Sequence, residues 1–516
     1  MIDSGGGTGS LLVAGTTSDA GKSLLTAGIC RWLARQGVRV APFKAQNMSN
    51  NSMVVGSGGP GESAGAEIGR AQVMQAAAAG VEPEVAMNPV LLKPGSDRTS
   101  QVVLLGKVFA EASATSYQDL KPRLREAVLA SYQDLKSRFD VVICEGAGSP
   151  TEINLREGDL VNMGLARPLG MPVVVVGDID RGGVFAAFHG TVALLDAEDQ
   201  KLISGFVINK FRGDPSLLTP GLRQIEGFTG RPVIGVVPWL PGIRLDAEDA
   251  LPIEAYRAAA TTEGARLRVA VVRFPRVSNF TDVDALAIEP GVDVEFTASA
   301  SAIESADLVV LPGTKSTVAD LAWLRERGLE PALAKRAAQG RPILGICGGY
   351  QMLGTEIEDE VESRRGTVAG LGLLPVRTVF DPVKTLTRPT GFGLGEAVDG
   401  YEIHNGQVQV TGGETLFTDA SGAALEGCRD GAVWGTIWHG ALESDGFRRA
   451  YLARVAEACG VRFEPDASVS FAAEREKQLD RLGDAVEEHL DTDRLWRLIE
   501  GGPTAGLPLL APGAGS

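Results

Sequence analysis

At residues 11–23 the chain reads Leu11-Leu-Val-Ala-Gly15-Thr-Thr-Ser-Asp-Ala-Gly21-Lys22-Ser23, an apolar run that enters a short loop with glycine and lysine. A helix-forming stretch, Leu24 to Arg35, follows at once. A strand, a glycine-containing loop and a helix in this order are typical of a phosphate loop, because amides at the helix start point toward a bound anion. The spacing is one residue longer than the standard pattern, but strand, loop and helix agree. The stretch therefore predicts a nucleotide-binding α/β domain.

Side chains at the ends of neighbouring strands are expected to complete this site. Lys22 adds a positive charge, and the hydroxyl of Ser23 can bind Mg²⁺. A second apolar strand, Phe139 to Cys144, delivers Glu145 at its carboxyl end, where ligands of parallel sheets bind, so Glu145 is the second candidate Mg²⁺ ligand. The residues predicted to bind ATP are Thr17, Asp19, Ala20, Gly21, Lys22, Ser23 and Asn209.

Short apolar runs rich in valine and isoleucine recur through the first half of the chain, with helical stretches between them. Continuous apolar strands of this kind are typical of a parallel sheet covered on both faces. The expected strands are Leu11–Ala14, Val38–Phe43, Val141–Cys144, Val173–Val176, Phe206–Ile208 and Val233–Val237. We assign residues 1–250 to this first domain.

A polar, alanine-rich stretch from about Asp246 to Ala265 interrupts the series and predicts a domain boundary. A second series of strands follows, and residues 265–455 are assigned to a second parallel-sheet α/β domain. Its expected strands are Leu267–Phe274, Leu308–Leu311 and Ile343–Ile346, with a helix at Thr317–Arg327.

The last part of the chain predicts a helix and a tail. Between Phe471 and Ile499 one helical stripe carries Leu479, Leu482, Val486 and Leu490, which indicates an amphipathic helix that packs on the body of the protein. Residues 456–500 are therefore assigned to a C-terminal helical extension. The tail, 501–516, is rich in glycine and proline and is predicted to be disordered; Gly56–Gly65 is expected to form a flexible loop.

Cys347 lies in a pattern typical of a nucleophile. In Arg341-Pro-Ile-Leu-Gly345-Ile-Cys347-Gly348-Gly349-Tyr-Gln351 an apolar strand runs into Gly-x-Cys-x-Gly and then into a helical segment. Small neighbours allow the tight turn that exposes a nucleophile, and the start of a helix favours the thiolate. A buried, inert cysteine is the ordinary alternative, and the flanking glycines argue against it.

A thiolate nucleophile needs a base, and the chain has four histidines. His189 belongs to the first domain and His489 to the terminal helix, whereas His439 follows a strand of the same domain as Cys347 and is the best candidate. For His404, a role at the domain interface and a structural role both remain open. The amides of Gly313, which follows an expected strand, and of Gly348 are predicted to form an oxyanion hole.

Composition excludes several other classes of protein. The formal net charge of −16 disfavours nonspecific binding of nucleic acid, which needs a surplus of lysine and arginine. Five scattered cysteines without a Cys-x-x-Cys pair fit neither a disulfide framework nor a zinc site. No long apolar run or export signal is present. We expect a cytoplasmic protein without nucleic-acid or membrane partners.

Both halves resemble known enzymes. The long phosphate loop resembles the dethiobiotin-synthetase-like branch of phosphate-loop enzymes. The elbow around Cys347 resembles a class I glutamine amidotransferase, which implies a flavodoxin-like second domain that releases ammonia from glutamine. In that class a glutamate stands two residues after the base, whereas this chain has Ala441 there, and Glu443 is left as an undecided alternative. Without an orienting carboxylate, we expect slow or synthetase-dependent glutamine hydrolysis.

The combination looks like the cobyric acid synthase family of corrinoid biosynthesis. The resemblance rests on several long strings: Gly15–Ser23, Ala41–Met48, Glu67–Gln72, Met87–Pro94, Glu145–Leu155, Gly177–Gly183, Tyr401–His404 and Trp438–Gly440. It implies amidation of the b, d, e and g carboxylates of adenosylcobyrinic acid a,c-diamide, with ATP, Mg²⁺ and glutamine. The residues expected to face the corrinoid carboxylates are Lys44, Asn47, Lys93, Arg98 and Arg181. A homo-oligomer is one open arrangement.

Rival functions remain at this level. The sister enzyme that amidates cobyrinic acid at a and c has the same domain order, and other glutamine-dependent amide ligases share the architecture. CTP synthase pairs similar domains, but the missing His-x-Glu ending and the Met87–Pro94 string count against it. A partitioning-type ATPase switch would carry a lysine early in the loop, where this chain has Thr16, Thr17 and Ser18.

Overall fold

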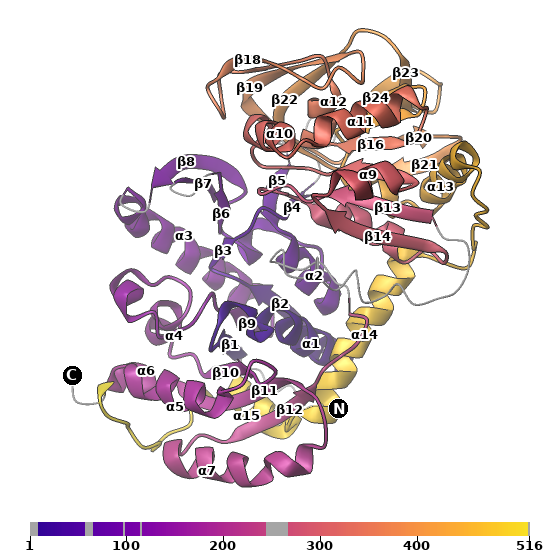
Figure 1. The fold of residues 1–516 in the computed structure, drawn as a ribbon. Helices are drawn as coiled ribbons and strands as arrows, with labels where there is room; N and C mark the ends of the chain where they lie inside the picture. Colours follow the sequence, from indigo (N-terminus) through magenta and orange to yellow (C-terminus); the bar gives the residue numbers. More distant parts are fainter. Residues whose placement is uncertain (1–8, 57–64, 96–98, 114–115, 244–266, 514–516) are drawn as a thin grey trace.

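The computed structural model describes residues 9–56, 65–95, 99–113, 116–243 and 267–513. Figure 1 shows two α/β bodies, one built from the first half of the chain and one from the second, with helix α14 (Phe471–His489) running from one to the other. The predicted fold class is confirmed, as two α/β domains with a helical C-terminal segment. The predicted boundary at residues 246–265 lies outside the described residues.

The first domain contains a six-stranded parallel sheet, and all six of its strands were predicted. Their order is β12 (Val233–Pro238), β11 (Ile203–Phe211), β10 (Val173–Asp178), β1 (Gly9–Gly15), β9 (Val141–Glu145) and β2 (Val40–Phe43). Alternate side chains serve two cores: Leu12 and Ala14 belong to one, Leu11 and Val13 to the other. This alternation is the reason that a fully apolar run forms a strand with both faces buried.

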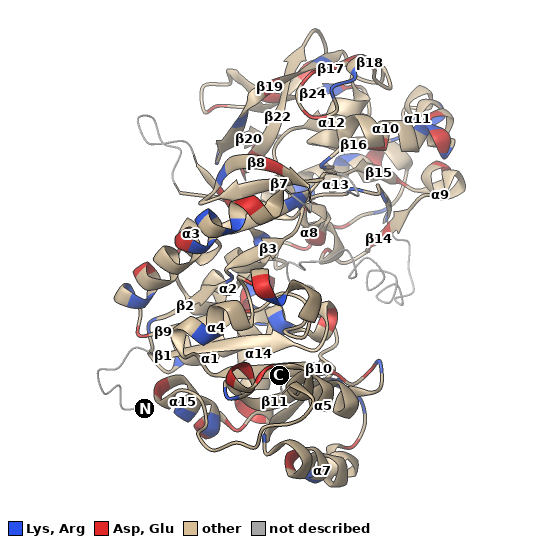
Figure 2. Ribbon diagram, turned by 90° about the vertical axis from the view of Figure 1, so that its left-hand side faces the viewer, with Lys and Arg blue, Asp and Glu red and all other residues tan. Residues whose placement is uncertain are grey.

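Helices cover both faces of this sheet. Helix α1 (Lys22–Arg35) packs with α14 on one face, beside α2 (Arg70–Ala79) and α15 (Thr492–Gly501). The other face is covered by α3 (Tyr117–Arg138), α4 (Met163–Leu169), α5 (Val184–Leu194) and α7 (Thr219–Thr229). The short helix α6 (Ala197–Gln200) lies next to α4. Figure 2 shows acidic and basic residues interspersed along α3, in keeping with its mixture of Asp119, Lys136 and Arg138.

Small sheets that were not predicted lie between the two bodies (Figure 1). One is a four-stranded sheet of β3 (Gln46–Met48), β6 (Val90–Pro94), β7 (Thr99–Leu104) and β8 (Lys107–Ser113). The other pairs β4 (Ser52–Val55) with β5 (Ala66–Gly69). Of the expected flexible loop, residues 57–64 lie outside the described residues.

The second domain combines a parallel sheet with antiparallel strands. Its parallel part has the order β14 (Val292–Thr297), β13 (Leu267–Val272), β15 (Leu308–Leu311), β16 (Ile343–Ile346) and β25 (Val433–Thr436). Antiparallel strands extend the sheet: β24 (Ala424–Asp430), β23 (Glu414–Thr418), β20 (Thr390–Gly393) and β21 (Glu396–Asp399). A second sheet contains β18 (Gly366–Ala369), β17 (Glu356–Asp359), β19 (Val376–Thr387) and β22 (Glu402–Val410). The helices are α8 (Asp284–Ala287), α9 (Ala300–Ser305), α10 (Thr317–Glu326), α11 (Leu329–Ala338), α12 (Gly348–Leu353) and α13 (Asp445–Cys459).

The C-terminal segment differs from expectation in two ways. The single predicted helix is broken at Leu490 and Asp491, where Asp491 accepts a hydrogen bond from the backbone of Arg494 and starts α15 as its N-cap.

The tail was predicted to be disordered, but its described part, residues 501–513, lies against the first domain. Gln200 exchanges side-chain hydrogen bonds with the backbone of Leu510 in both directions, at 2.9 and 2.7 Å. Composition misses such contacts because they depend on tertiary partners.

Candidate active sites

The turn at Cys347 has the geometry of a nucleophile elbow. Cys347 follows β16, precedes α12 and has φ 49° and ψ −111°, a conformation that costs a non-glycine residue about 1–3 kcal/mol. Glycine is required on both sides, because a Cβ at Gly345 would lie 2.8 Å from the amide nitrogen of Tyr350, and one at Gly349 would lie 1.9 Å from the carbonyl oxygen of Leu311. The strained turn is therefore held by its neighbours.

His439 lies beside Cys347 and is oriented by a carboxylate that the sequence analysis missed. Nδ1 of His439 is 2.7 Å from Oδ2 of Asp282, while Oδ1 of Asp282 accepts a hydrogen bond of 2.9 Å from the backbone of Gly440. Cys347 and His439 line the same pocket, of about 40 Å³. Because Asp282 engages Nδ1, the other ring nitrogen is left for the thiol. Cys347, His439 and Asp282, which are far apart in the sequence, thus have the arrangement that a nucleophile, a base and an orienting acid require.

The charge state of His439 follows from these neighbours. Burial by itself disfavours the imidazolium, but the carboxylate of Asp282 and the hydrogen-bonded sulfur of Cys347 outweigh burial and raise the pKa of His439 to about 10. A protonated ring next to the sulfur favours the thiolate form of a cysteine.

The sequence left open whether any carboxylate orients His439, and in the structure Asp282 lies in that position. Glu443, the undecided alternative, does not contact the imidazole in any hydrogen bond of the described residues and pairs instead with Arg70 of the first domain. Asp282 lies in a short 3₁₀ segment after β13, Phe280–Val283, with Asp284 close by, and nothing in the local sequence indicates a partner 157 residues away.

The predicted oxyanion residues lie close to this pair. A Cβ at Gly313 would be 2.9 Å from Cε1 of His439, and one at Gly348 would be 3.1 Å from the backbone nitrogen of Thr314. The turn after β15 and the start of α12 are therefore side by side, next to the pocket. Amides in such a position can stabilise the oxyanion of a tetrahedral intermediate.

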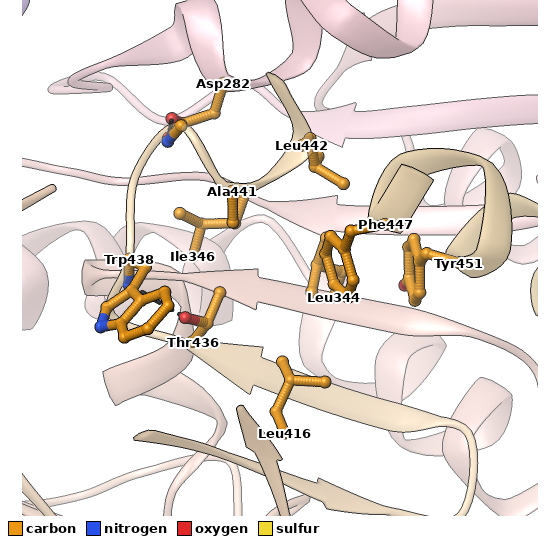
Figure 3. Close-up of a pocket in the computed structure, with 11 residues that line it drawn as sticks. Asp282, Leu344, Ile346, Leu416, Thr436, Trp438, Ala441, Leu442, Phe447 and Tyr451 are labelled. Carbon is orange, nitrogen blue, oxygen red and sulfur yellow. Dashed lines mark hydrogen bonds between the residues drawn. The ribbon is translucent and has the colours of Figure 1, made fainter. Parts of the chain in front are cut away.

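Apolar side chains pack against the loop that carries His439, here called the histidine loop. Figure 3 shows Leu344, Ile346, Ala441, Leu442 and Phe447 around a cavity of about 10 Å³, with Asp282 at its edge. A space of this size is at the lower limit for a single water molecule. The cavity is thus part of the core that fixes the loop rather than a ligand site.

The phosphate loop of the first domain is tightly built around Lys22. Gly21 has φ 92°, and a Cβ there would lie 2.1 Å from Nδ2 of Asn209, which donates to the carbonyl oxygen of Ala20 at 2.9 Å. Nζ of Lys22 donates to the carbonyl oxygens of Thr17 and Ser18, at 2.8 and 3.0 Å. The loop can therefore only be formed with glycine at position 21, and Asn209 of β11, two strands from β1 in the sheet, supports it.

Glu145 and Ser23 fit a magnesium site. Oγ of Ser23 is 2.7 Å from Oε1 of Glu145, and Lys44 and Gln75 donate to the same carboxylate at 3.0 and 2.5 Å. Burial alone would raise the pKa of Glu145, but Lys44, followed by the hydrogen bonds from Ser23 and Gln75, holds it below its usual value. A hydroxyl and one anionic carboxylate suit Mg²⁺, which takes its other ligands from phosphates and water. In the part of the chain that the structure describes, no cluster of three or more His, Cys, Asp or Glu side chains suggests a different metal site.

A cavity of about 760 Å³ adjoins the phosphate loop and is large enough for a bulky substrate. Lys22 and Lys44 line it, together with Lys121 and Arg156, which the sequence analysis did not single out. Because the last two come from α3 and from a short 3₁₀ segment, Ile153–Gly158, no strand-end rule points to them.

The other predicted substrate residues are dispersed. Asn47 is buried and donates to Gln72, Arg181 is an exposed partner of Asp19 beside the phosphate loop, and Arg98 lies outside the described residues. Lys93 lines the pocket of Cys347, not the large cavity, and pairs with the buried carboxylate of Glu67. His404 also lines the pocket of Cys347 and bonds the carbonyl of Gly406 through Nδ1.

Strand β6 is a wall between the two cavities. Leu92 and Pro94 line the large cavity, whereas Lys93 lines the pocket of Cys347. Successive side chains of a strand point to opposite sides. One strand therefore separates the candidate glutaminase from the candidate nucleotide site.

Comparisons with known proteins agree with this arrangement. Residues 11–253 match a family described as the CobQ/CobB/MinD/ParA nucleotide binding domain, and residues 268–447 match the CobB/CobQ-like glutamine amidotransferase domain. No helix among the described residues has the length and apolar character needed to cross a bilayer.

Full-length relatives share both domains. A protein of Streptomyces avermitilis named cobyric acid synthase is 61% identical over 514 residues, which cover 98% of this chain and 99% of that protein. Proteins of the same name from Frankia casuarinae and Mycobacterium tuberculosis are each 58% identical, with at least 98% of this chain and 99% of theirs covered.

Proposed function

This chain belongs to the cobyric acid synthase family, and on that premise we propose that it uses ATP and glutamine to amidate the b, d, e and g carboxylates of adenosylcobyrinic acid a,c-diamide. The observation that carries the proposal is the pair of cavities on either side of β6, one with a cysteine, histidine and aspartate, the other with a phosphate loop. Each cavity supplies one half of an amide synthesis.

In the second domain, the thiolate of Cys347 attacks the carboxamide carbon of glutamine. His439 transfers a proton to the leaving nitrogen, ammonia departs, and a thioester remains at Cys347, which water then hydrolyses to glutamate. Asp282 keeps the ring in one orientation in both steps, the release of ammonia and the hydrolysis of the thioester. The amides of Gly313 and Gly348 would donate to the oxyanion of each tetrahedral intermediate.

In the first domain, a carboxylate oxygen of the corrinoid attacks the γ-phosphorus of ATP and ADP leaves. Ammonia then attacks the carbonyl carbon of the acyl phosphate, the C–O bond breaks, and phosphate departs. Lys22 and the loop amides hold the transferred phosphoryl group. Mg²⁺, held by Ser23 and Glu145, would neutralise the charge that develops on the oxygens of the phosphoryl group.

We place the corrinoid in the large cavity, with Lys44, Lys121 and Arg156 facing its carboxylates. These side chains line the cavity, where Lys44 and Arg156 also pair with Glu145 and Asp199, and positive groups of this kind suit a polycarboxylate. Lys93 is assigned instead to the glutamine side. We further expect the protein to work in a reducing compartment such as the cytoplasm, since its five cysteines are all free.

Mass spectrometry of the corrinoid product tests the proposal. The purified chain is incubated with ATP, Mg²⁺, glutamine and adenosylcobyrinic acid a,c-diamide, and in parallel with cobyrinic acid. We expect the diamide to lose mass in four steps, each the exchange of a hydroxyl for an amino group. Conversion of cobyrinic acid only as far as its a,c-diamide would instead identify the sister activity, and no amidation of either corrinoid would refute both.

A further inference from the structure

An arginine of the first domain reaches into the glutaminase. Arg70 is the first residue of α2 and its side chain is 1% exposed. Its guanidinium donates a hydrogen bond of 2.9 Å to the hydroxyl of Tyr401 and pairs with the carboxylate of Glu443. Both partners belong to the second domain, so this buried charge is satisfied across the domain boundary.

Tyr401 in turn lies flat on the catalytic histidine. The centroids of the Tyr401 and His439 rings are 5.3 Å apart, with planes inclined by 24°. The two backbones also exchange hydrogen bonds of 3.0 Å in both directions. The titratable groups next to the imidazole include Asp282, Cys347 and Tyr401, with Arg70 and Glu443 behind the phenol. The pocket that His439 shares with Cys347 is also lined by Lys93, Lys315, Glu362, Lys384 and His404.

We infer that Arg70 is a positioning residue for His439, supplied to the glutaminase by the nucleotide-binding domain. A planar guanidinium fixes two acceptors at once, and here they are the phenol stacked on His439 and a carboxylate four residues after it. The phenol packs on the face of the imidazole, whereas Asp282 bonds Nδ1 at its edge. This inference rests on the proposed glutaminase role of Cys347 and His439.

The middle of the same helix contacts the nucleotide site. Gln75 donates a hydrogen bond of 2.5 Å to Oε2 of Glu145 and another, of 3.4 Å, to the carbonyl oxygen of Ser23. Nine of the ten residues of α2 are buried, so the helix is held as a rigid body. The element that positions His439 is therefore anchored at the carboxylate proposed to bind magnesium.

The test compares Arg70→Met, Arg70→Lys and Tyr401→Phe in the full-length chain. For each variant, corrinoid amidation is measured with glutamine and, separately, with ammonium chloride as the nitrogen source, and alkylation of Cys347 by iodoacetamide is followed against pH. We expect Arg70→Met to lower the glutamine-dependent kcat by roughly a hundredfold, as displacement of a catalytic group by about an ångström does. The ammonium-dependent rate is expected to stay near that of the wild type, and the pH profile of alkylation to shift.

Arg31→Met is the matched control, since Arg31 is an arginine of the same domain whose partners, Glu476 and Asp480, lie on α14. Arg70→Lys should recover part of the glutamine-dependent activity. Tyr401→Phe removes only the hydroxyl and should also lose glutamine-dependent but not ammonium-dependent activity, so it tests the inference even if Arg70→Met does not fold. Equal loss with both nitrogen sources, or a glutamine-dependent rate and pH profile like those of Arg31→Met, would overturn the inference. Absence of glutamine hydrolysis in the wild type would instead refute the proposed function.

Discussion

At the scale of single residues, the proposed glutaminase site joins an aspartate and a histidine that lie 157 positions apart. Cys347 was identified from the strand and glycines around it, and His439 because it is the histidine, among four, that follows a strand of the same domain and best suits a base. Asp282 and Gln75 were not, because a hydrogen bond formed only after folding leaves no trace in the sequence around either partner. Ser23 and Glu145 were predicted as a pair because both follow strands of one parallel sheet.

Asp282→Asn should lower the glutamine-dependent kcat by roughly a hundredfold to ten-thousandfold, since an amide no longer fixes the tautomer of His439. Loss of the carboxylate also lowers the pKa of His439 from about 10. The imidazolium then loses its proton at a lower pH and no longer favours the thiolate near neutral pH. The rate of Cys347 alkylation should therefore fall more at neutral pH than at pH values above the usual range of a thiol, where the thiolate forms without the imidazolium. Stopped-flow alkylation across pH measures this. Asp419→Asn, in a surface turn of the same domain, is the control; a profile like that control would contradict the assignment.

Cys347→Ala should abolish synthesis from glutamine and leave synthesis from ammonium salts, because the synthetase site lies on the far side of β6. Coupled assays of ADP release with each nitrogen source measure both activities. Cys428→Ala replaces another buried cysteine of the same domain and should affect neither. Loss of both activities in Cys347→Ala alone would show that the two sites do not divide the reaction in this way.

At the scale of elements, the sequence was informative where strands are buried on both faces. β1, β9 and β10 read as continuous apolar runs because helices cover each side. β3 and β20 contain three and four residues, with glutamine, asparagine or glycine among them. Their pairing is decided by the tertiary partners against which they lie, so neither composition nor period singled them out.

The packing of α14 on α1 gives an element-scale prediction. A Cβ at Gly28 would lie 2.7 Å from the backbone carbonyl oxygen of Leu482, and a backbone atom has little freedom to move aside. Gly28→Ala should therefore destabilise the protein by about 1–3 kcal/mol in urea unfolding. Gly190 lies in the interior of α5, where a Cβ would have no heavy atom of the described residues within 4 Å, so Gly190→Ala should instead stabilise the protein by up to about 1 kcal/mol. Equal effects would mean that α1 and α14 are not in close contact.

At the scale of the whole molecule, a buried ionic cluster joins the two bodies. Glu67 of β5 accepts hydrogen bonds from Lys93 of β6 and, at 2.6 Å, from Lys384 of β19. Burial alone would raise the pKa of Glu67, but the two lysines reverse this effect and hold it far below its usual value. The same burial lowers the pKa of Lys384 to about 8, although Glu67 opposes the change.

Glu67→Gln should cost about 3–5 kcal/mol of unfolding free energy at neutral pH, because two lysines are left buried without a carboxylate. Since the pKa of Glu67 is lowered by folding, its contribution is present above its unfolded value of 4.5 and is lost as pH falls. The difference between wild type and variant should thus narrow in acid. Glu111→Gln breaks an exposed pair with Arg364 across the same boundary and should change little. A difference for Glu67→Gln that is constant with pH would contradict the ionic explanation.

The wall formed by β6, together with the reach of Arg70, limits how this protein can be recombined. A hybrid made by exchanging whole domains at the linker would place a foreign amidotransferase domain against β6 and α2 of this chain. Lys93 and Arg70 would then lie next to residues other than their partners in this protein. The unit of exchange is therefore larger than the amidotransferase fold: a working chimera must carry these two elements with it, and natural drift in one half is constrained by the other.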